Sequence, residues 1–140
     1  MSLSTYQRHL DNIPKQYRLL KLFRPPIYVI ELSNNQVSAV CYYKDGSSKR
    51  HQINADFSNR RMVIADFLSA VQAITDLLLK FPKHPFGISS FAVVNVTEEL
   101  IDGLTMIEIK AIREAVWAAS GQAKRRIVSS TVNYQGQVVS

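Results

Sequence analysis

The spacing of apolar residues changes once along this chain, and that change restricts the fold more than any other feature. Three short runs lie between residues 27 and 53, separated by Ser33-Asn34-Asn35 and Lys44-Asp45-Gly46-Ser47. The first run, residues 27–31, is β-branched and aromatic, and the second, residues 36–43, alternates between apolar and polar residues. A period of two predicts strands, and turns containing Asn or Asp-Gly predict hairpins. We therefore predict an antiparallel meander of three strands over residues 27–31, 36–43 and 49–53.

From residue 62 the spacing becomes helical. Apolar residues recur every three or four positions up to residue 81, which predicts an amphipathic helix that ends before Pro82. The nearly continuous apolar run over residues 91–96 is typical of a strand buried on both faces. Thr105 and Glu108 have the spacing of a capping box, so a second helix is expected to begin there and to end at Gly121.

A last strand is expected over residues 125–132, and residues 133–140 are weakly patterned. The resulting order is β-β-β-α-β-α-β. It predicts an α/β (α+β) domain over residues 25–140 with a mixed five-stranded sheet, the order of the ribonuclease-H-like core on which actin-type ATPases are built.

Residues 1–24 are expected to be a separate basic segment. Residues 1–14 are polar and predict a loose tail, and residues 15–24 predict a short amphipathic helix closed by Pro25-Pro26. So short a helix needs a surface, which is its own domain, a protein partner or a membrane. The predicted contact residues of this segment are Lys15, Arg18, Lys21, Phe23 and Arg24.

The positive charge is concentrated in the first part of the chain. Residues 1–61 carry ten Lys/Arg and four Asp/Glu, whereas residues 62–140 carry seven of each. This asymmetry favours an anionic partner, with plain solubility as the alternative. No apolar run approaches the roughly 20 residues that span a bilayer, and the single cysteine, Cys41, fits a reducing compartment. We expect a cytoplasmic protein, with a peripheral membrane location as a further option.

Several segments together resemble one protein family. Residues 20–24 read Leu-Lys-Leu-Phe-Arg, residues 62–67 read Met-Val-Ile-Ala-Asp-Phe, residues 93–97 read Val-Val-Asn-Val-Thr, and the second helix carries Thr105, Glu108 and residues 111–115, Ala-Ile-Arg-Glu-Ala. From about Leu20 to Val128 the chain resembles the first lobe of an MreB-type bacterial actin. The resemblance implies an actin-like lobe and a place among cell-shape and cytoskeletal proteins.

The chain differs from that family at the positions where the family binds its nucleotide. Its first hairpin carries Asp-Leu-Gly-Thr, whose acid helps to organise the metal and whose small residues let backbone amides approach phosphate. The phosphate-binding positions here are occupied by Glu31, Ser33 and Asn34. The family's second phosphate loop, Asp-x-Gly-Gly-Gly-Thr, and its adenosine-binding segment have no counterpart in the 140 residues. We therefore expect no ATP or magnesium cofactor and no catalytic residue.

Other chemistry finds little support in the residues. The three histidines lack metal-ligand spacing, so no metal site is predicted. A ribonuclease-H-like nuclease would need several converging carboxylates, for which Glu31, Asp66, Glu98 and Glu99 are the candidates; the structural alternative is a helix cap and loop surface. A basic tract of Lys124, Arg125 and Arg126, together with residues 49–51 and 60–61, is the predicted anion-binding region.

The sequence thus favours a non-catalytic, actin-related interaction module. Its expected partner is a cytoskeletal or envelope-associated protein or a second copy of itself. The expected contacts are an exposed sheet end and the helix from Glu108 to Trp117. The alternative is a basic ribonuclease-H-like protein that binds nucleic acid, or a degenerate nuclease. Nucleic acid remains the less favoured partner, because no aromatic platform accompanies the basic tracts.

Overall fold

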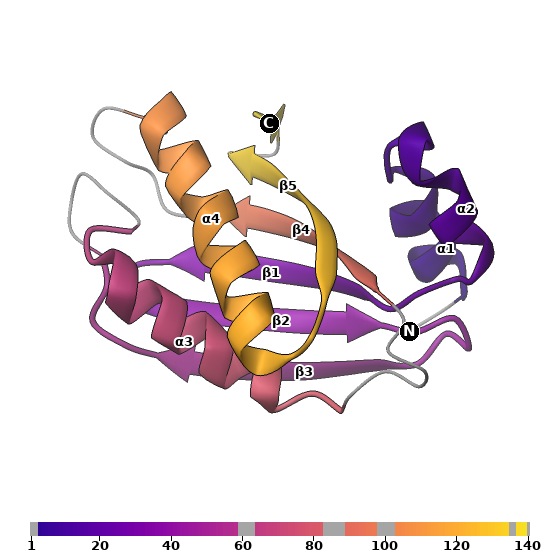
Figure 1. The fold of residues 1–140 in the computed structure, drawn as a ribbon, viewed down its shortest axis with the longest axis horizontal. Helices are drawn as coiled ribbons and strands as arrows, with labels where there is room; N and C mark the ends of the chain where they lie inside the picture. The colour runs from indigo at the N-terminus through magenta and orange to yellow at the C-terminus, as the bar shows by residue number, and fades with distance from the viewer. Residues whose placement is uncertain (1–2, 59–63, 83–88, 98–102, 135–136, 140) are drawn as a thin grey trace.

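A computed structural model describes residues 3–58, 64–82, 89–97, 103–134 and 137–139 of the chain. Two layers of secondary structure, a sheet and a pair of helices, form most of the molecule, and an N-terminal helical segment lies at one end of the sheet (Figure 1). The elements in chain order are α1 (Leu3–Asp11), η1 (Lys15–Tyr17), α2 (Arg18–Leu22), β1 (Ile27–Ser33), β2 (Gln36–Tyr42), β3 (Ser48–Asn54), α3 (Phe67–Leu79), β4 (Ser90–Val96), α4 (Met106–Ala123), β5 (Ile127–Tyr134) and β6 (Gln137–Val138).

The described strands form one mixed sheet in the order β3-β2-β1-β4-β5-β6. β1, β2 and β3 are the predicted antiparallel meander, β4 runs parallel to β1, and β5 runs parallel to β4. The predicted α/β class and the element order β-β-β-α-β-α-β are confirmed for the described residues. The two-residue strand β6 pairs antiparallel with the end of β5 and makes the sheet six-stranded rather than five-stranded.

Helices α3 and α4 cover one face of the sheet and enclose the main core. Alternate residues of the central strands point into it, so that Tyr28, Ile30 and Leu32 of β1 are fully buried. The predicted helical spacing is observed in α3, where Ile74 and Leu77 pack into this core. The predicted start at residue 62 was too early, because residues 64–66 are not helical and α3 begins at Phe67, after its cap Asp66; residues 59–63 lie outside the described residues.

The N-terminal residues are not a loose tail, and that prediction was wrong. In α1, Tyr6 and Leu10 are buried, and with Ile13 they form a second small core against Ile27 and Phe91 at the start of β1 and β4. The Tyr6 hydroxyl donates a hydrogen bond of 2.7 Å to the carbonyl of Pro25. A helix this short is held by its packing rather than by its own propensity, so local sequence gave little warning of it.

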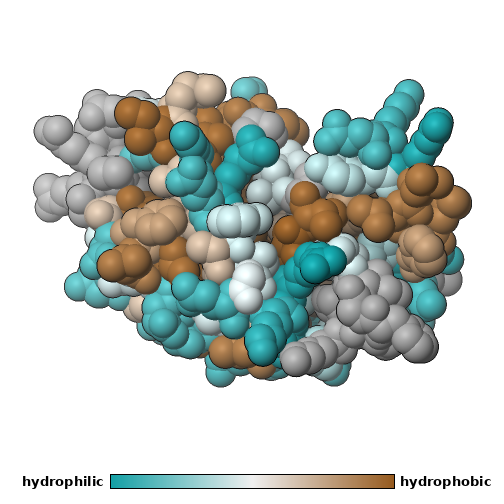
Figure 2. Space-filling model, in the orientation of Figure 1, coloured by the Kyte–Doolittle hydropathy of each residue, from teal (hydrophilic) through white to brown (hydrophobic). Residues whose placement is uncertain are grey.

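Residues 15–24 also differ from the single amphipathic helix that was predicted. They form the 3₁₀ turn η1 and the five-residue helix α2, and Phe23 and Arg24 follow the helix. Tyr17 and Leu20 pack against the small N-terminal core, whereas Leu19, Leu22 and Phe23 are exposed. Figure 2 shows this apolar surface over α2 at the right of the view.

The helix starts follow the local signals in the sequence. The Thr105 hydroxyl accepts a bond from the Glu108 amide (3.2 Å), and the Glu108 carboxylate accepts one from the Thr105 amide (3.1 Å), so the capping box is confirmed. The Asp66 carboxylate accepts from the Ser69 amide, a bond that lowers the pKa of Asp66. The expected stop at Gly121 was wrong, because α4 continues to Ala123 and ends at Lys124 in the left-handed conformation (φ 55°).

Candidate functional site

The turn between β1 and β2 carries Ser33 and Asn34, and with Glu31 it is the hairpin in which a degenerate phosphate loop was predicted. Glu31 is exposed on β1, and the Ser33 hydroxyl donates to the Gln36 side chain at 3.2 Å. Asn34 and Asn35 form the turn itself, and Asn35 takes the left-handed conformation with φ of 55°. An asparagine tolerates this conformation better than most residues, so the turn forms without glycine.

Asn35 ties this turn to the segment that follows β3. Its side-chain oxygen accepts bonds from the backbone amides of Phe57 (2.9 Å) and Ser58 (2.7 Å). Its own amide donates to the Ser58 hydroxyl at 3.1 Å, and its carbonyl accepts from the Ala55 amide. The Asn35 amide, at the tip of the turn, is therefore engaged by protein atoms and is not available to an incoming phosphate.

The carboxylates do not build a metal centre in the part of the chain that the structure describes. No group of three or more His, Cys, Asp or Glu side chains is placed to hold a metal ion there. Glu98 and Glu99, two of the nuclease candidates, lie outside the described residues, and Asp66 serves as the cap of α3. Burial raises the pKa of the Cys41 thiol to about 12, which keeps it protonated and unreactive.

The predicted anion-binding tract separates into two kinds of residue. Arg125 is buried, and its guanidinium donates to the Phe81 carbonyl at 2.8 and 3.2 Å and to the Ala123 carbonyl at 2.7 Å. It therefore joins the ends of α3 and α4 and is removed from the predicted anion site. Lys124 and Arg126 are exposed and remain available to an anion.

The predicted N-terminal contact residues gather at one corner of the molecule. Lys15, Arg18 and Phe23 are exposed, and Lys21 is half-buried. The Arg24 guanidinium lies 5.5 Å from the centre of the Tyr6 ring, so it also contacts α1. None of the described helices has the length and apolar composition needed to cross a bilayer.

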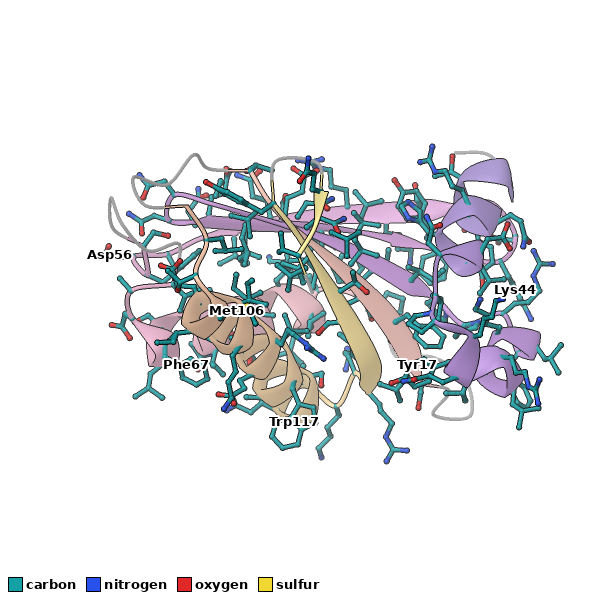
Figure 3. The ribbon with its side chains drawn as sticks, turned by 90° about the horizontal axis from the view of Figure 1, so that it is seen from above. Tyr17, Lys44, Asp56, Phe67, Met106 and Trp117 are labelled. Carbon is teal, nitrogen blue, oxygen red and sulfur yellow. The ribbon has the colours of Figure 1, made fainter. Side chains whose placement is uncertain are left out.

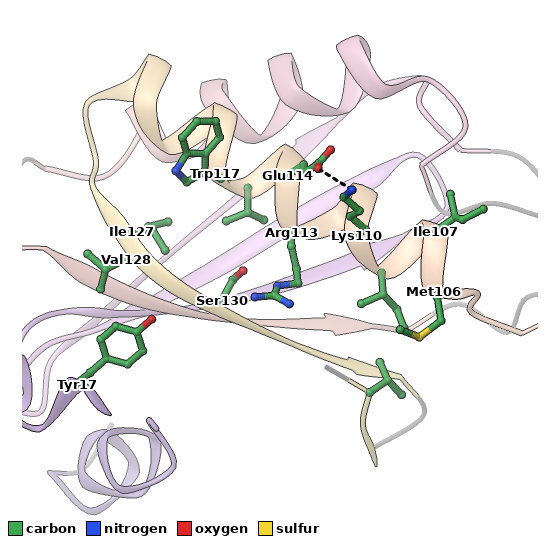
Figure 4. Close-up of a pocket in the computed structure, with 13 residues that line it drawn as sticks. Tyr17, Met106, Ile107, Lys110, Arg113, Glu114, Trp117, Ile127, Val128 and Ser130 are labelled. Atoms are coloured by element: carbon green, nitrogen blue, oxygen red, sulfur yellow. Dashed lines mark ion pairs between the residues drawn. The ribbon is translucent and has the colours of Figure 1, made fainter. Parts of the chain in front are cut away.

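A hollow beside α4 was not predicted from the sequence. A groove of about 900 Å³ runs between α4 and the outer edge of β5, and Tyr17 lies at one end of it (Figure 4). Its remaining lining residues are Met106, Ile107, Ile109, Lys110, Arg113, Glu114, Val116, Trp117, Ile127, Val128, Ser130 and Val139. Trp117 was predicted as a contact residue, and the lining residues from Ile109 to Val116 belong to the helix that was predicted as a contact surface.

The rim of this groove carries large apolar side chains that point away from the core. Met106, Ile107 and Trp117 are 78%, 79% and 73% exposed. Figure 3 shows Trp117 projecting from α4 away from the sheet. The sequence did hold a signal for this rim, because these residues fall outside the spacing of the buried positions Ile112, Ala115 and Ala119 along the helix.

The backbone of β5 is open along most of the groove. Within the described residues β6 pairs only with Asn133 and Tyr134, so the edge of β5 from Ile127 to Thr131 has no neighbouring strand. Such an edge presents amides and carbonyls that another chain can pair with. The groove therefore combines a backbone edge with an apolar wall.

No protein-family model matches this sequence, and no curated protein matches it. Solved structures that overlap with it include the ethanolamine utilization protein EutJ from Carboxydothermus hydrogenoformans, with a TM-score of 0.47 and 15% identity, and the PPX-GPPA enzyme of Aquifex aeolicus, with a TM-score of 0.41 and 14% identity. The overlaps cover 78% and 79% of this chain but only 37% and 36% of those proteins. At these values the similarity does not assign the chain to a family.

Proposed function

We propose that this chain is a non-catalytic interaction module related to the MreB-type bacterial actins. It binds a cytoskeletal or envelope-associated protein, and the groove between α4 and β5 is its docking surface. The observation that carries the proposal is the open edge of β5 beside the exposed side chains of Met106, Ile107 and Trp117. A large apolar patch beside unpaired strand backbone is typical of protein interaction sites.

The state of the first hairpin supports the absence of nucleotide chemistry. A phosphate held at this turn needs backbone amides and close approach, but the Asn35 amide bonds to Ser58, and Ser33 and Asn34 add side chains. We expect ATP with magnesium to leave the thermal unfolding midpoint unchanged. Isothermal titration calorimetry with ATP and magnesium checks this, and micromolar binding would refute it.

The N-terminal corner supports a second contact of the same module. Leu19, Leu22 and Phe23 are 71%, 78% and 64% exposed, and Lys15 and Arg18 lie in the same short segment. Basic residues mixed with exposed Leu and Phe are the composition of interfacial helices. We propose that this corner contacts anionic lipid and gives a cytoplasmic protein a peripheral membrane location.

Co-sedimentation with purified MreB-type filaments tests the docking surface. We expect the wild-type chain to pellet with filaments and Trp117→Ser to remain in the supernatant. The matched control is Leu68→Ser, which removes an equally exposed apolar side chain from α3 and should pellet like the wild type. If the wild type ignores filaments, and stays monomeric in sedimentation velocity at high concentration, the proposed function is wrong.

The nucleic-acid alternative has weaker support. Of the tract at residues 124–126, only Lys124 and Arg126 offer exposed charge, because Arg125 is bound to carbonyls inside the molecule. Affinity that falls steeply with salt would favour this alternative, since each phosphate contact releases counterions. Retention on immobilised DNA or RNA across a salt titration is the measurement.

A further inference from the structure

We infer that the groove between α4 and β5 receives an extended acidic segment of a protein partner, added to the sheet beside β5. This inference rests on the proposed function and specifies the chemistry of its partner. It follows from three features of the groove: its backbone edge, the depth of its apolar wall and the sign of its charges.

The backbone edge selects an extended chain. The Val132 carbonyl accepts a bond of 2.9 Å from the Val139 amide, so the outer edge of β5 already pairs with another segment at this end. In a strand, the amide and carbonyl groups of every second residue point to the same edge. Those of Ser130, two residues before Val132, therefore point to the outer edge of β5 as well. A segment that continues along β5 would find these groups in register for strand addition.

The two edges of the sheet differ in how they are protected. β3, at the opposite edge, carries Lys49, Arg50 and His51, and charged residues on an edge strand discourage pairing with other chains. β5 reads Ile-Val-Ser-Ser-Thr-Val-Asn-Tyr and has no charged residue. The edge without charges is also the edge with the groove, which points to β5 as the pairing edge.

The wall of the groove accepts apolar side chains from such a segment. Ile109 and Val116 of α4 and Ile127 of β5 form its buried part, and Met106 and Trp117 stand at its rim. Alternate side chains of an added strand point to the same face of the sheet. Every second residue of the partner would therefore lie against α4 and favour an apolar side chain.

The charges of the groove select an acidic partner. Lys110 and Glu114 form an ion pair at 3.9 Å across one turn of α4. Arg113 extends toward Ser130 in Figure 4 and has no ion pair within the described part of the chain. Arg126 is exposed directly before β5. A carboxylate on the added segment would meet Arg113 and could form a bidentate pair with it.

The same charges disfavour a second copy of this chain as the occupant. A two-fold pair of β5 edges would bring the same patch of both copies together, with Arg113 and Arg126 from each. Like charges placed opposite one another in a sheet are destabilising, and each copy carries a net charge of +6. Only a partner with carboxylates neutralises this edge.

Fluorescence anisotropy with a labelled eight-residue peptide of alternating Val and Glu tests the inference on the full chain. We expect the peptide to bind, and a peptide of alternating Val and Lys to bind at least tenfold more weakly. A Val-Glu peptide with N-methyl groups on alternate amides should also bind at least tenfold more weakly, because it cannot form the backbone hydrogen bonds of an added strand. Equal binding of the methylated and unmethylated peptides would overturn strand addition.

Two variants with the same charge change separate the groove from general attraction to a basic protein. Arg113→Glu should weaken binding of the Val-Glu peptide at least tenfold and strengthen binding of the Val-Lys peptide. Arg50→Glu, on β3, should change either affinity less than threefold. Equal effects of the two variants would overturn the inference. If filaments bind and Trp117→Ser abolishes that binding, but the Val-Glu peptide neither binds nor competes, the proposed function stands and the acidic strand is wrong.

Discussion

Single side chains hold together segments that are distant in the sequence. Asn35 connects the first hairpin with the residues after β3, and Arg125 connects the end of α3 with the end of α4. In both cases a polar side chain satisfies backbone groups that would otherwise need water or a ligand. Neither contact could be predicted from the sequence, because the partners of Asn35 lie 22 and 23 residues away and Phe81 lies 44 residues from Arg125.

Asn35→Gly should lower the free energy of unfolding by about 1–3 kcal/mol, since two partly buried amides lose their acceptor. Glycine tolerates the positive φ of this position, so the loss reports the side chain and not backbone strain. Urea unfolding at neutral pH measures it. Asn35→Asp keeps an acceptor for both amides and should stay within about 1 kcal/mol of the wild type; an equal loss in both variants would refute the role assigned to this acceptor.

Arg125→Met should lower the free energy of unfolding more than Arg126→Met does. The first variant leaves the carbonyls of Phe81 and Ala123 without their charged donor, and hydrogen bonds to charged groups contribute about 1.5–3 kcal/mol. The second changes an exposed side chain, for which a shift within about 0.5 kcal/mol is expected. Chemical denaturation of the two variants gives the comparison, and similar losses would contradict an internal role for Arg125.

At the level of elements, local signals predicted most of the fold. The β-branched run at residues 27–31, the alternation of residues 36–43 and the two turns predicted the meander. Asp66 and the Thr105–Glu108 box marked the starts of α3 and α4, and the apolar run predicted β4. The failures fell where packing decides the outcome. α1 exists because Tyr6 and Leu10 cover Ile27 and Phe91, and nothing local reveals that contact.

The same reason limited the prediction of the candidate site. Trp117 was expected at a contact surface and is exposed, but its groove depends on how α4 lies beside β5. Periodicity assigns a residue to a face of its own helix and cannot say which strand lies next to that face. The open edge of β5 likewise became visible only when the pairing of β6 was known.

Leu10→Ala tests whether α1 is an integral element. Leu10 is 6% exposed in the small N-terminal core, and removing a buried leucine side chain costs about 2–5 kcal/mol. Leu19→Ala, at a position that is 71% exposed, should change stability by less than about 0.5 kcal/mol. Thermal and urea unfolding distinguish the two, and a neutral Leu10 variant would mean that α1 contributes nothing to the fold.

At the scale of the whole molecule, four buried groups link stability to alkaline pH. Burial raises the pKa of Tyr6 and of Cys41 to about 12, and it also raises the pKa of Tyr28 and Tyr43. Each group is held neutral by folding, and the unfolded chain loses these protons from about pH 9 for the thiol and pH 10 for the phenols. In this pH range the folded state therefore holds more protons than the unfolded state.

Stability should therefore be level from pH 7 to 8 and fall as the pH rises from 9 toward 12. Urea midpoints measured at one-unit intervals give the slope. Cys41→Ala removes one of the groups and should make the decline between pH 9 and 11 shallower, whereas Asp56→Asn changes an exposed carboxylate that does not act on the pKa of any of the four groups and should leave the slope as it is. A stability that rises with pH above 9 would contradict this account.

The bonds between Asn35 and Ser58 also bear on how such a chain can change over evolutionary time. A glycine at position 33 or 34 leaves the Asn35 amide bonded to Ser58. A substitution at position 58 alone frees this amide but leaves the side chains of Ser33 and Asn34 in place. Neither change alone yields a turn that could hold a triphosphate, because the other obstacle remains. A turn that accepts phosphate therefore needs changes at both places: release of the Asn35 amide from Ser58 and smaller residues at positions 33 and 34.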